Sequence, residues 1–322
     1  MKIALRVDGS KRLGMGHVYR CKVMAQNFNK NNISCIFLTQ FKQIYKHLIS
    51  EGFDVFFIRK KDEFKQVNLI LKNEHCSKLV IDSKRKSVGK LIKNLDKKIK
   101  VVMIDNSYFS NDVDLVVLSS IKDPKKQYSQ NTIVGRKYIL HGIKEPLKPV
   151  RQKNHSILIS MGGSDKYHIT KKIIKSLCKN NFNFNVNVIL GKFNDDEKQI
   201  NKIIKDDQRF HVLKNPTSLV SLMQQSTIGI ITFGISVYEA AVCRLPLYVI
   251  SHSDENHHSA KLVEELGWMV YAGKYDEINY DEITKNILSL MNSESKLQKM
   301  KQACLQIDGL GPQHVAEHIQ KL

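Results

Sequence analysis

Long apolar runs are absent from this sequence. No stretch approaches the roughly 20 consecutive apolar residues that a helix needs to cross a bilayer. Charged residues also appear at Lys2, Arg6 and Asp8, too early for the apolar segment of a signal peptide. The sequence therefore predicts a cytoplasmic protein without a membrane-spanning segment.

Closely spaced cysteines are also absent. The six cysteines are scattered, mostly among apolar neighbours: Cys21, Cys35, Cys76, Cys178, Cys243 and Cys304. This pattern predicts reduced core cysteines, with neither disulfide bonds nor a zinc site. His252, His257 and His258 lie close together, but adjacent histidines on a helix point in different directions, and no acidic or cysteine ligands at suitable spacing accompany them. We therefore expect neither a metal nor another cofactor.

Acidic residues are scarce relative to basic ones. With 51 lysines and arginines against 31 aspartates and glutamates, the formal net charge is +20. The lysines are spread over the whole chain, and no basic stripe interleaved with aromatics marks a nucleic-acid surface. Nucleic acid is therefore not an expected partner. The charge instead suits phosphorylated substrates or a peripheral contact with an anionic membrane surface.

Apolar runs and helical patterns do alternate along the chain, in two successive series. Such alternation favours a parallel sheet covered by helices. The length of 322 residues exceeds the usual size of one domain, roughly 100 to 200 residues. A polar segment around Pro146 and Pro149 is typical of a linker. We therefore predict an α/β protein with two Rossmann-like domains, residues 1–149 and 150–322, and with strands at 34–38, 54–58, 79–82, 101–105, 115–118, 156–160, 187–191, 210–213, 228–232 and 247–250.

A glycine-rich loop, residues 8–17, follows the apolar run of the first expected strand and precedes the first expected helix. Gly14 and Gly16 permit close approach of a ligand, and His17 brings a group that changes protonation near neutral pH. Ligands bind at this edge of open α/β sheets, because helix N-termini there leave amides unpaired. The loop thus suits acid–base chemistry on a phosphorylated substrate. The alternative is an ordinary strand-to-helix turn whose histidine only hydrogen-bonds the backbone.

Two aspartates, Asp82 and Asp105, end expected strands at the edge where Asp8 and His17 should lie. Carboxylates at strand ends orient a histidine or a sugar hydroxyl, or they cap the following helix. For Asp82 both interpretations stay open, and Asp105 is the weaker candidate of the two.

The second half of the chain repeats the pattern of strand, glycine turn and helix. Gly162, Gly163 and Ser164 form one such turn, and residues 233–240 form another. Glycine turns with free amides suit a diphosphate, and Glu239 can accept two hydrogen bonds from ribose hydroxyls. Ser236 and Glu239 also have the spacing of a capping box, which is the interpretation that the local sequence favours.

The motifs together resemble a known group of proteins over nearly the whole chain. That group comprises the PseG-type nucleotide-sugar hydrolases and the related SpsG spore-coat polysaccharide proteins. The motifs that carry the resemblance are Arg6-x-Asp8-x-Ser10, Gly14-x-Gly16-His17-x-x-Arg20-Cys21, Met161-Gly162-Gly163-Ser164-Asp165, Ser236-x-x-Glu239, Glu255-Asn256 and Asp308-Gly309-x-Gly311-x-x-x-Val315-Ala316.

This resemblance implies the GT-B fold, in which a nucleotide sugar lies in the cleft between two α/β halves. It implies that the second half binds uridine diphosphate (UDP), with Ser236 helping to hold the diphosphate and Glu239 on the ribose. It also implies that His17 acts on the sugar side as a metal-independent base for a water molecule. Asp82, at the strand end of the same edge, is the second candidate catalytic residue. The residues assigned to substrate binding are Asp8, Ser10, Gly14, Gly16, Arg20, Gly162, Gly163, Ser164, Ser236, Glu239, Glu255 and Asn256.

The reaction that the resemblance implies is release of UDP from UDP-2,4-diacetamido-2,4,6-trideoxy-β-L-altrose or a similar acetamido-deoxy sugar. Such a step belongs to the biosynthesis of pseudaminic acid or a related surface glycan, as in flagellin glycosylation. The alternatives are a GT-B glycosyltransferase, similar to the peptidoglycan N-acetylglucosaminyl transferase, and a non-catalytic nucleotide-sugar binding protein.

One departure from the family pattern concerns the residues after Asp82. The hydrolases tend to carry a tyrosine there, whereas this chain has Ser83, Lys84 and Arg85. A cationic side chain cannot replace a phenol as a hydrogen-bond acceptor. The exact sugar, the stereochemical outcome and the oligomeric state therefore stay open at the level of sequence.

Overall fold

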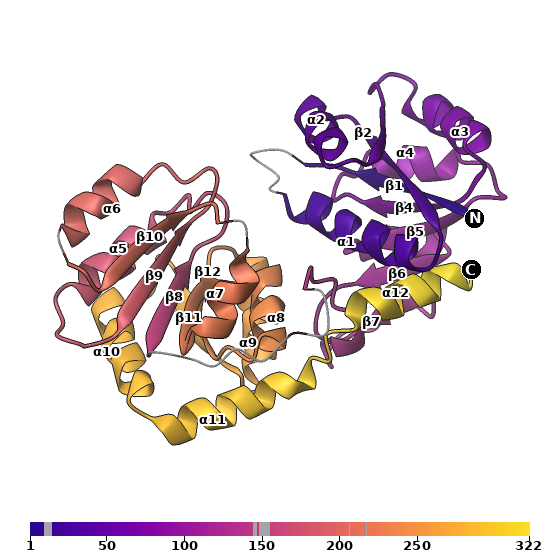
Figure 1. Cartoon of the computed structure of the whole chain (residues 1–322). Coiled ribbons are helices and arrows are strands. Elements are labelled where there is room, and N and C mark those ends of the chain that lie inside the picture. The colour runs from indigo at the N-terminus through magenta and orange to yellow at the C-terminus, as the bar shows by residue number, and fades with distance from the viewer. Residues whose placement is uncertain (10–14, 144–146, 148–154, 206, 217) are drawn as a thin grey trace. The chain divides into compact units, whose positions relative to one another are not determined.

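The computed structural model describes all residues except 10–14, 144–146, 148–154, 206 and 217 (Figure 1). The chain divides into two compact units. The first unit contains Met1–Gly142 and Leu310–Leu322, and the second contains Ile143–Gly309. In the described part of the chain, no helix is both long enough and apolar enough to cross a membrane.

The first unit is built on a seven-stranded parallel sheet with the order β3-β2-β1-β4-β5-β6-β7. Its strands are β1 (Lys2–Val7), β2 (Ser34–Thr39), β3 (Asp54–Phe57), β4 (Cys76–Asp82), β5 (Lys100–Ile104), β6 (Leu115–Leu118) and β7 (Thr132–Val134). Its helices are α1 (Gly16–Lys30), α2 (Lys42–Ser50), α3 (Glu63–Asn73), α4 (Val88–Lys93), η1 (Ser107–Asp112), η2 (Arg136–Tyr138) and α12 (Gly311–Gln320).

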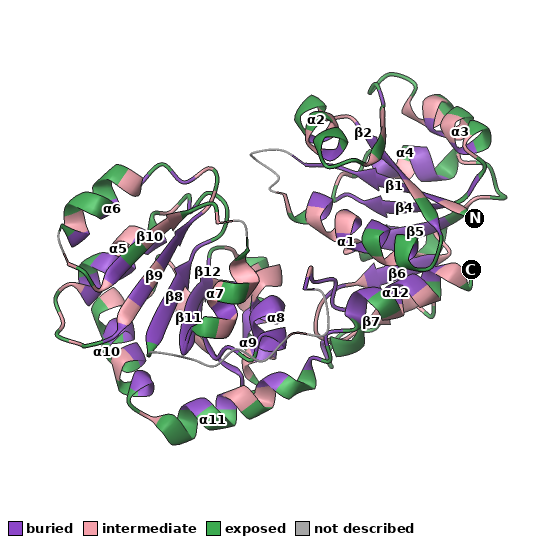
Figure 2. Cartoon of the chain, in the orientation of Figure 1, coloured by how far each residue is buried: buried purple, intermediate pink, exposed green. Residues whose placement is uncertain are grey.

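Helices cover both faces of this sheet. Neighbouring residues of β1 point to opposite sides and so contribute to two separate cores. Ile3, Leu5 and Val7 belong to a core with α1, α2 and α12, while Ala4 belongs to a second core with α3 and α4. The inner strands of the sheet are accordingly buried along most of their length, whereas the edge strands β3 and β7 are partly exposed (Figure 2). The apolar run of residues in β1 therefore reflects a strand that is buried on both faces.

The second unit is built on a six-stranded parallel sheet with the order β10-β9-β8-β11-β12-β13. Its strands are β8 (Ser156–Ser160), β9 (Asn185–Leu190), β10 (Phe210–Lys214), β11 (Ile228–Thr232), β12 (Leu247–Ser251) and β13 (Met269–Lys274). Its helices are α5 (Ile169–Leu177), α6 (Glu197–Ile204), α7 (Leu219–Gln225), α8 (Ile235–Val242), α9 (Asp254–Glu264), α10 (Tyr280–Met291), α11 (Glu294–Ala303) and η3 (Cys304–Gln306).

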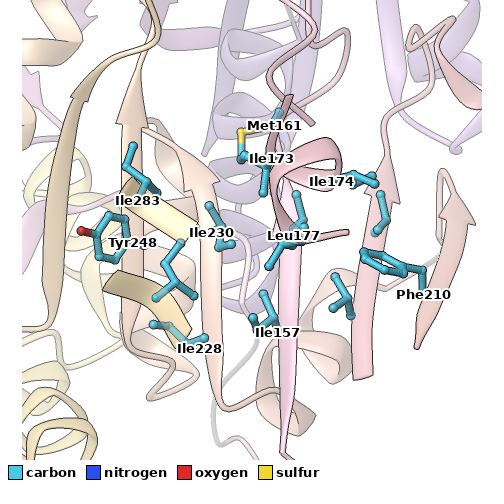
Figure 3. Close-up of a cluster of buried hydrophobic side chains, with 14 of the residues drawn as sticks. Ile157, Met161, Ile173, Ile174, Leu177, Phe210, Ile228, Ile230, Tyr248 and Ile283 are labelled. Carbon is cyan, nitrogen blue, oxygen red and sulfur yellow. The ribbon is translucent and has the colours of Figure 1, made fainter. Parts of the chain in front are cut away.

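A core of isoleucine and leucine side chains fills one face of the second sheet. Ile157 and Ile230 of adjacent strands pack there with Ile173 and Leu177 of α5 (Figure 3). In both units the strand order reverses beside the first strand, so that β1 and β8 each lie next to the crossover. Ligands bind at such switch points, at the carboxyl ends of the strands.

The parallel two-domain α/β architecture predicted from the alternation is confirmed. All ten strands expected by residue range are present as strands. The six cysteines are free in the structure, and Cys21, Cys76, Cys243 and Cys304 are buried.

The expected domain assignment is wrong for the C-terminal segment. The sequence predicts residues 310–322 in the second domain, but α12 packs on the first unit, where Val315, Ala316 and Ile319 are fully buried. The physical reason is that α12 completes the apolar cover over α1 and β1. The boundary expected between residues 149 and 150 lies outside the described residues.

Lys78 fixes the end of α12 to the first sheet. This buried lysine of β4 donates hydrogen bonds of 2.7 Å to the carbonyl oxygens of Ile319 and Gln320. These carbonyls have no partner within the helix, because they belong to its last turn. A buried lysine thereby satisfies a helix C-terminus, and its charge also suits the negative end of the helix dipole.

Replacing Lys78 with methionine is expected to loosen α12 and to lower the melting temperature by a few degrees. Hydrogen bonds to charged groups contribute about 1.5–3 kcal/mol, and both carbonyls lose their donor. Thermal melts and hydrogen exchange at α12 measure the effect. The Lys100→Met variant is the control, because Lys100 pairs with Asp114 at the surface. Equal melting temperatures for the two variants would contradict the anchoring role.

Candidate functional site

The opening loop places His17 at the carboxyl edge of the first sheet. β1 ends at Val7, and α1 begins at Gly16 with Met15 as its N-cap. His17 lies in the first turn of α1 with 11% of its side chain exposed. Gly16 is exposed, and no atom of the described residues lies within 4 Å of where its Cβ would be. The predicted binding residues Ser10 and Gly14 lie outside the described residues.

His17 contacts a buried carboxylate through one ring nitrogen. Its Nδ1 lies 2.5 Å from Oδ1 of Asp82, the last residue of β4, whose side chain is fully buried. An ionised carboxylate is an acceptor, so the neutral imidazole carries its proton on Nδ1. Nε2 is then the ring acceptor, and among the described residues it has no hydrogen-bond partner. The contact with Asp82 thus fixes the tautomer of the neutral ring and leaves Nε2 as its acceptor.

Asp82 is kept ionised by its neighbours. Burial alone would raise the pKa of this carboxyl, but the Arg20 charge and the hydrogen bonds from His17 and Arg20 outweigh it and lower the pKa. Arg20 donates from Nε to Oδ2 and from Nη2 to Oδ1, both at 2.9 Å, in a two-pronged contact. The side-chain contacts of Asp82 are therefore those of a residue that orients His17, rather than those of a helix cap.

The guanidinium of Arg20 contacts a second aspartate besides Asp82. Its third nitrogen, Nη1, lies 2.8 Å from Oδ2 of Asp105, so its guanidinium spans two carboxylates. Burial alone would lower the pKa of Arg20, but the charges of Asp82 and Asp105 raise it beyond its usual range. Arg20 was predicted to bind substrate. In the structure its guanidinium nitrogens are engaged by aspartates.

Asp8 is the centre of a second charge network at the same edge. Its carboxylate accepts hydrogen bonds from Arg6 Nη1 at 2.7 Å, from Ser83 Oγ at 2.6 Å and from both Nε and Nη2 of Arg85. Burial would raise the pKa of Asp8, but the charges of Arg6 and Arg85 and the Ser83 hydroxyl together lower it. Asp8, predicted to bind substrate, is thus held as an ionised acceptor inside the unit.

The residues that follow Asp82 have different roles. Ser83 and Arg85 hold Asp8, and Arg85 also donates to Oε1 of Gln40 at 3.1 Å and 3.2 Å. Lys84 between them is exposed. Sequence reasoning missed the contribution of Arg85 and Gln40. Their only signal was their position at the carboxyl ends of strands β4 and β2.

In the second unit, the glycine turn after β8 is braced by the loop after β9. Gly162 has a positive φ of 77°, and Gly163 and Ser164 are exposed. A Cβ on Gly191 would lie 2.4 Å from the carbonyl oxygen of Gly162, so only glycine permits this close approach. The amide of Phe193 donates to the carbonyl of Gly163 at 2.9 Å. The turn predicted to approach a diphosphate is therefore shaped by the loop after β9.

Asp165 caps the helix that follows this turn. Its two carboxylate oxygens accept the amides of Ile169 and Thr170 at 2.8 Å and 2.9 Å. Burial raises the pKa of Asp165, although the hydrogen bonds from Thr170 and Ile169 oppose the rise. The first amides of α5 are thus taken by the protein.

The capping box proposed for Ser236 and Glu239 is wrong. Helix α8 begins at Ile235 with Gly234 as its N-cap, and no side chain of the described residues caps it. Ser236 and Glu239 therefore lie inside the helix, where they are half-buried and buried respectively. Their spacing places them one turn apart on the same side of α8.

Glu255 and Asn256 lie in the first turn of α9. Asn256 donates from Nδ2 to the carbonyl of Phe233 at 3.2 Å and so links α9 to the loop before α8. Ser253 accepts the amide of Asn256 and caps the helix. Glu255 is exposed. The structure thus brings Asn256 to the turn that precedes Ser236.

Comparison with known proteins gives relatives at low identity. No family model matches the chain. An uncharacterized protein of Methanocaldococcus jannaschii is 29% identical over 79% of this chain, which spans 56% of that longer relative. Spore coat polysaccharide biosynthesis protein SpsG of Bacillus subtilis is 22% identical over 100% of this chain and 98% of its own length. UDP-2,4-diacetamido-2,4,6-trideoxy-beta-L-altropyranose hydrolase of Campylobacter jejuni is 24% identical over 84% of this chain and 98% of its own length.

Solved structures similar to this chain include glycosyltransferases. MurG of Acinetobacter baumannii gives a TM-score of 0.77 at 13% identity, covering 100% of this chain and 99% of that one. The spinosyn forosaminyltransferase SpnP gives 0.75 at 10% identity, covering 100% and 98%. The resemblance to SpsG and PseG-type proteins and the GT-B fold are therefore confirmed.

Proposed function

We propose that this chain, related to SpsG and PseG-type proteins and built on the GT-B fold, is an enzyme that hydrolyses a UDP-sugar without a metal. The observation that carries the proposal is His17, whose Nδ1 is fixed by buried Asp82 and whose Nε2 has no partner in the described part of the chain. A buried, oriented imidazole at a strand-end edge has the features expected of a general base.

In the proposed reaction, Nε2 of His17 accepts a proton from a water molecule that attacks the anomeric carbon. The bond between that carbon and the diphosphate oxygen breaks, and UDP leaves with the electron pair. Asp82 stabilises the imidazolium that forms. A positioned general base contributes about a hundredfold to ten-thousandfold in rate, or roughly 3–5 kcal/mol of the barrier.

The nucleotide is assigned to the second unit. Gly162, Gly163 and Ser164 would approach the diphosphate, and Ser236 and Glu239 would contact the diphosphate and the ribose. The exposed glycine turn and the start of α8, where no described side chain caps the helix, support this assignment, because the N-terminus of a helix favours a phosphate. The hydrogen bond from Asn256 to the carbonyl of Phe233 links the start of α9 to the loop that precedes α8.

The sugar is proposed to be an acetamido-deoxy sugar, such as 2,4-diacetamido-2,4,6-trideoxy-β-L-altrose, in the biosynthesis of pseudaminic acid or a related surface glycan. This part rests on the hydrolase of Campylobacter jejuni, to which the chain is similar. The residues after Asp82 differ from the family pattern, and the network of Arg85 with Asp8 is the part of the first unit in which a different sugar would be accommodated.

A second candidate function is transfer of the sugar to an acceptor. The observation that favours it is the likeness of the whole fold to glycosyltransferases. A membrane-bound acceptor would suit the net charge of +20 and a peripheral contact with an anionic surface. A nucleotide-sugar binding protein without catalysis is the third.

A panel of UDP-sugars, incubated with the protein with and without acceptors and followed by mass spectrometry, tests the proposal. We expect UDP and the free sugar from UDP-2,4-diacetamido-2,4,6-trideoxy-β-L-altrose or a close analogue, without any acceptor. UDP release that depends strictly on an acceptor would favour the transferase. Binding of UDP without turnover of any donor at high protein concentration would contradict both enzymatic functions.

A further inference from the structure

Asp105 lies where the charge network around His17 ends. It directly follows β5 and has a positive φ of 49°, which is uncommon for any residue with a side chain but best tolerated by aspartate and asparagine. Its Oδ1 accepts the amide of Ser119 at 2.7 Å, and its Oδ2 lies 2.8 Å from Nη1 of Arg20. One oxygen therefore holds Asp105 to the chain after β6, while the other is presented to Arg20.

His17, Asp82, Arg20 and Asp105 form one charged cluster. Its charge balance explains how a second carboxylate would help His17 to accept a proton. Arg20 alone would neutralise Asp82, and its Nη2 lies 3.1 Å from Nδ1 of His17, where it opposes a positive charge on the ring. With Asp105 present, the two aspartates exceed the one arginine by a single negative charge. The cluster then becomes neutral when His17 accepts a proton, which is the state that a base must reach.

We propose that Asp105 is a positioning residue for His17 and acts through Arg20. Asp105 holds the guanidinium in its two-pronged contact with Asp82 and offsets its charge, so that Asp82 stays available to the imidazolium. The proposal rests on the proposed role of His17 as a base. Among the described residues, the buried Cys21 thiol on α1 interacts electrostatically with Asp82, Arg20 and Asp8, and Asp8 is paired with Arg6 and Arg85.

The Asp105→Asn variant removes the carboxylate charge and places an amide donor where Oδ2 contacts Arg20. Asparagine tolerates the left-handed backbone, and its side-chain oxygen can still accept the Ser119 amide. We expect kcat to fall by about tenfold, KM to stay unchanged and the acid limb of the profile of kcat/KM against pH to move down by about one unit. Asp114→Asn is the matched control, because Asp114 pairs with Lys100 at the surface and should leave the profile unchanged.

A measurement without substrate separates this inference from the proposed reaction. The Nδ1 proton of His17, shared with Asp82, should give a far-downfield proton resonance, assigned by its absence in His17→Asn. Loss or an upfield shift of that resonance in Asp105→Asn supports the positioning role, even if no UDP-sugar is turned over. An unchanged resonance and pH profile would overturn it. Arg20→Lys, which cannot span both carboxylates, should give the same result and replaces Asp105→Asn if that variant does not fold.

Discussion

Replacing His17 with asparagine is expected to lower kcat for UDP release by about a hundredfold to ten-thousandfold, while the affinity for UDP stays unchanged. The reason is that Nε2 is the only ring atom left to accept a proton, since Nδ1 faces Asp82. Isothermal titration with UDP and a continuous assay of UDP release measure the two quantities separately.

Asparagine is chosen because its side-chain amide can still donate to Asp82. The buried carboxylate then keeps its partner, and the variant is expected to melt close to wild type. The His47→Gln variant is the control, since His47 lies on α2 in the same unit with 36% of its side chain exposed. Turnover of His17→Asn equal to that of His47→Gln would contradict the assignment of the base and favour a binding protein.

The two sheets could be predicted from the sequence because their strands carry strong local signals. Runs such as Val101–Ile104 and Ile228–Thr232 are apolar and β-branched, and their alternation with helices permits few arrangements other than parallel sheets. The proximity of His17 and Asp82 follows from the same rule. Val7 pairs with Asp82 across β1 and β4, so the residues after β1 lie beside the end of β4.

The role of Arg20 could not be predicted in this way. Its sequence position only places it one turn after His17, and an arginine beside a glycine loop is equally suited to a phosphate. The two aspartates that bind its guanidinium are Asp82, at the end of β4, and Asp105, directly after β5. Which charges meet is decided by side-chain packing at the sheet edge, which local patterns do not encode.

The same limit explains two errors of the sequence interpretation. Ser236 and Glu239 have the spacing of a capping box, but spacing does not fix where the helix starts, and α8 starts one residue before Ser236. Helix α12 has the apolar face of any surface helix. Only the tertiary structure shows that Val315 and Ile319 pack on the first unit.

Replacing Asp82 with asparagine is expected to impair both stability and catalysis. Asp82 accepts from His17 and twice from Arg20, and the amide of asparagine would place a donor against at least one of these donors. Breaking a buried charged pair costs about 3–5 kcal/mol. The same amide can donate to Nδ1 of His17, which would move the ring proton to Nε2 and remove the base. We therefore expect kcat to fall by about a hundredfold to ten-thousandfold.

The stability of Asp82→Asn should depend on pH in a defined direction. Burial favours a raised pKa for Asp82, but Arg20 and His17 lower it below the ordinary 3.8 in the folded chain. Such a carboxylate stabilises the fold above its unfolded-state pKa, and this contribution is lost as pH falls through the folded-state value. The gap in melting temperature between wild type and Asp82→Asn should therefore be widest at neutral pH and narrow below about pH 4. A gap that is constant from pH 7 to pH 3 would show that Asp82 does not carry a charge important for folding. Wild-type turnover in the folded variant would show that Asp82 does not orient His17.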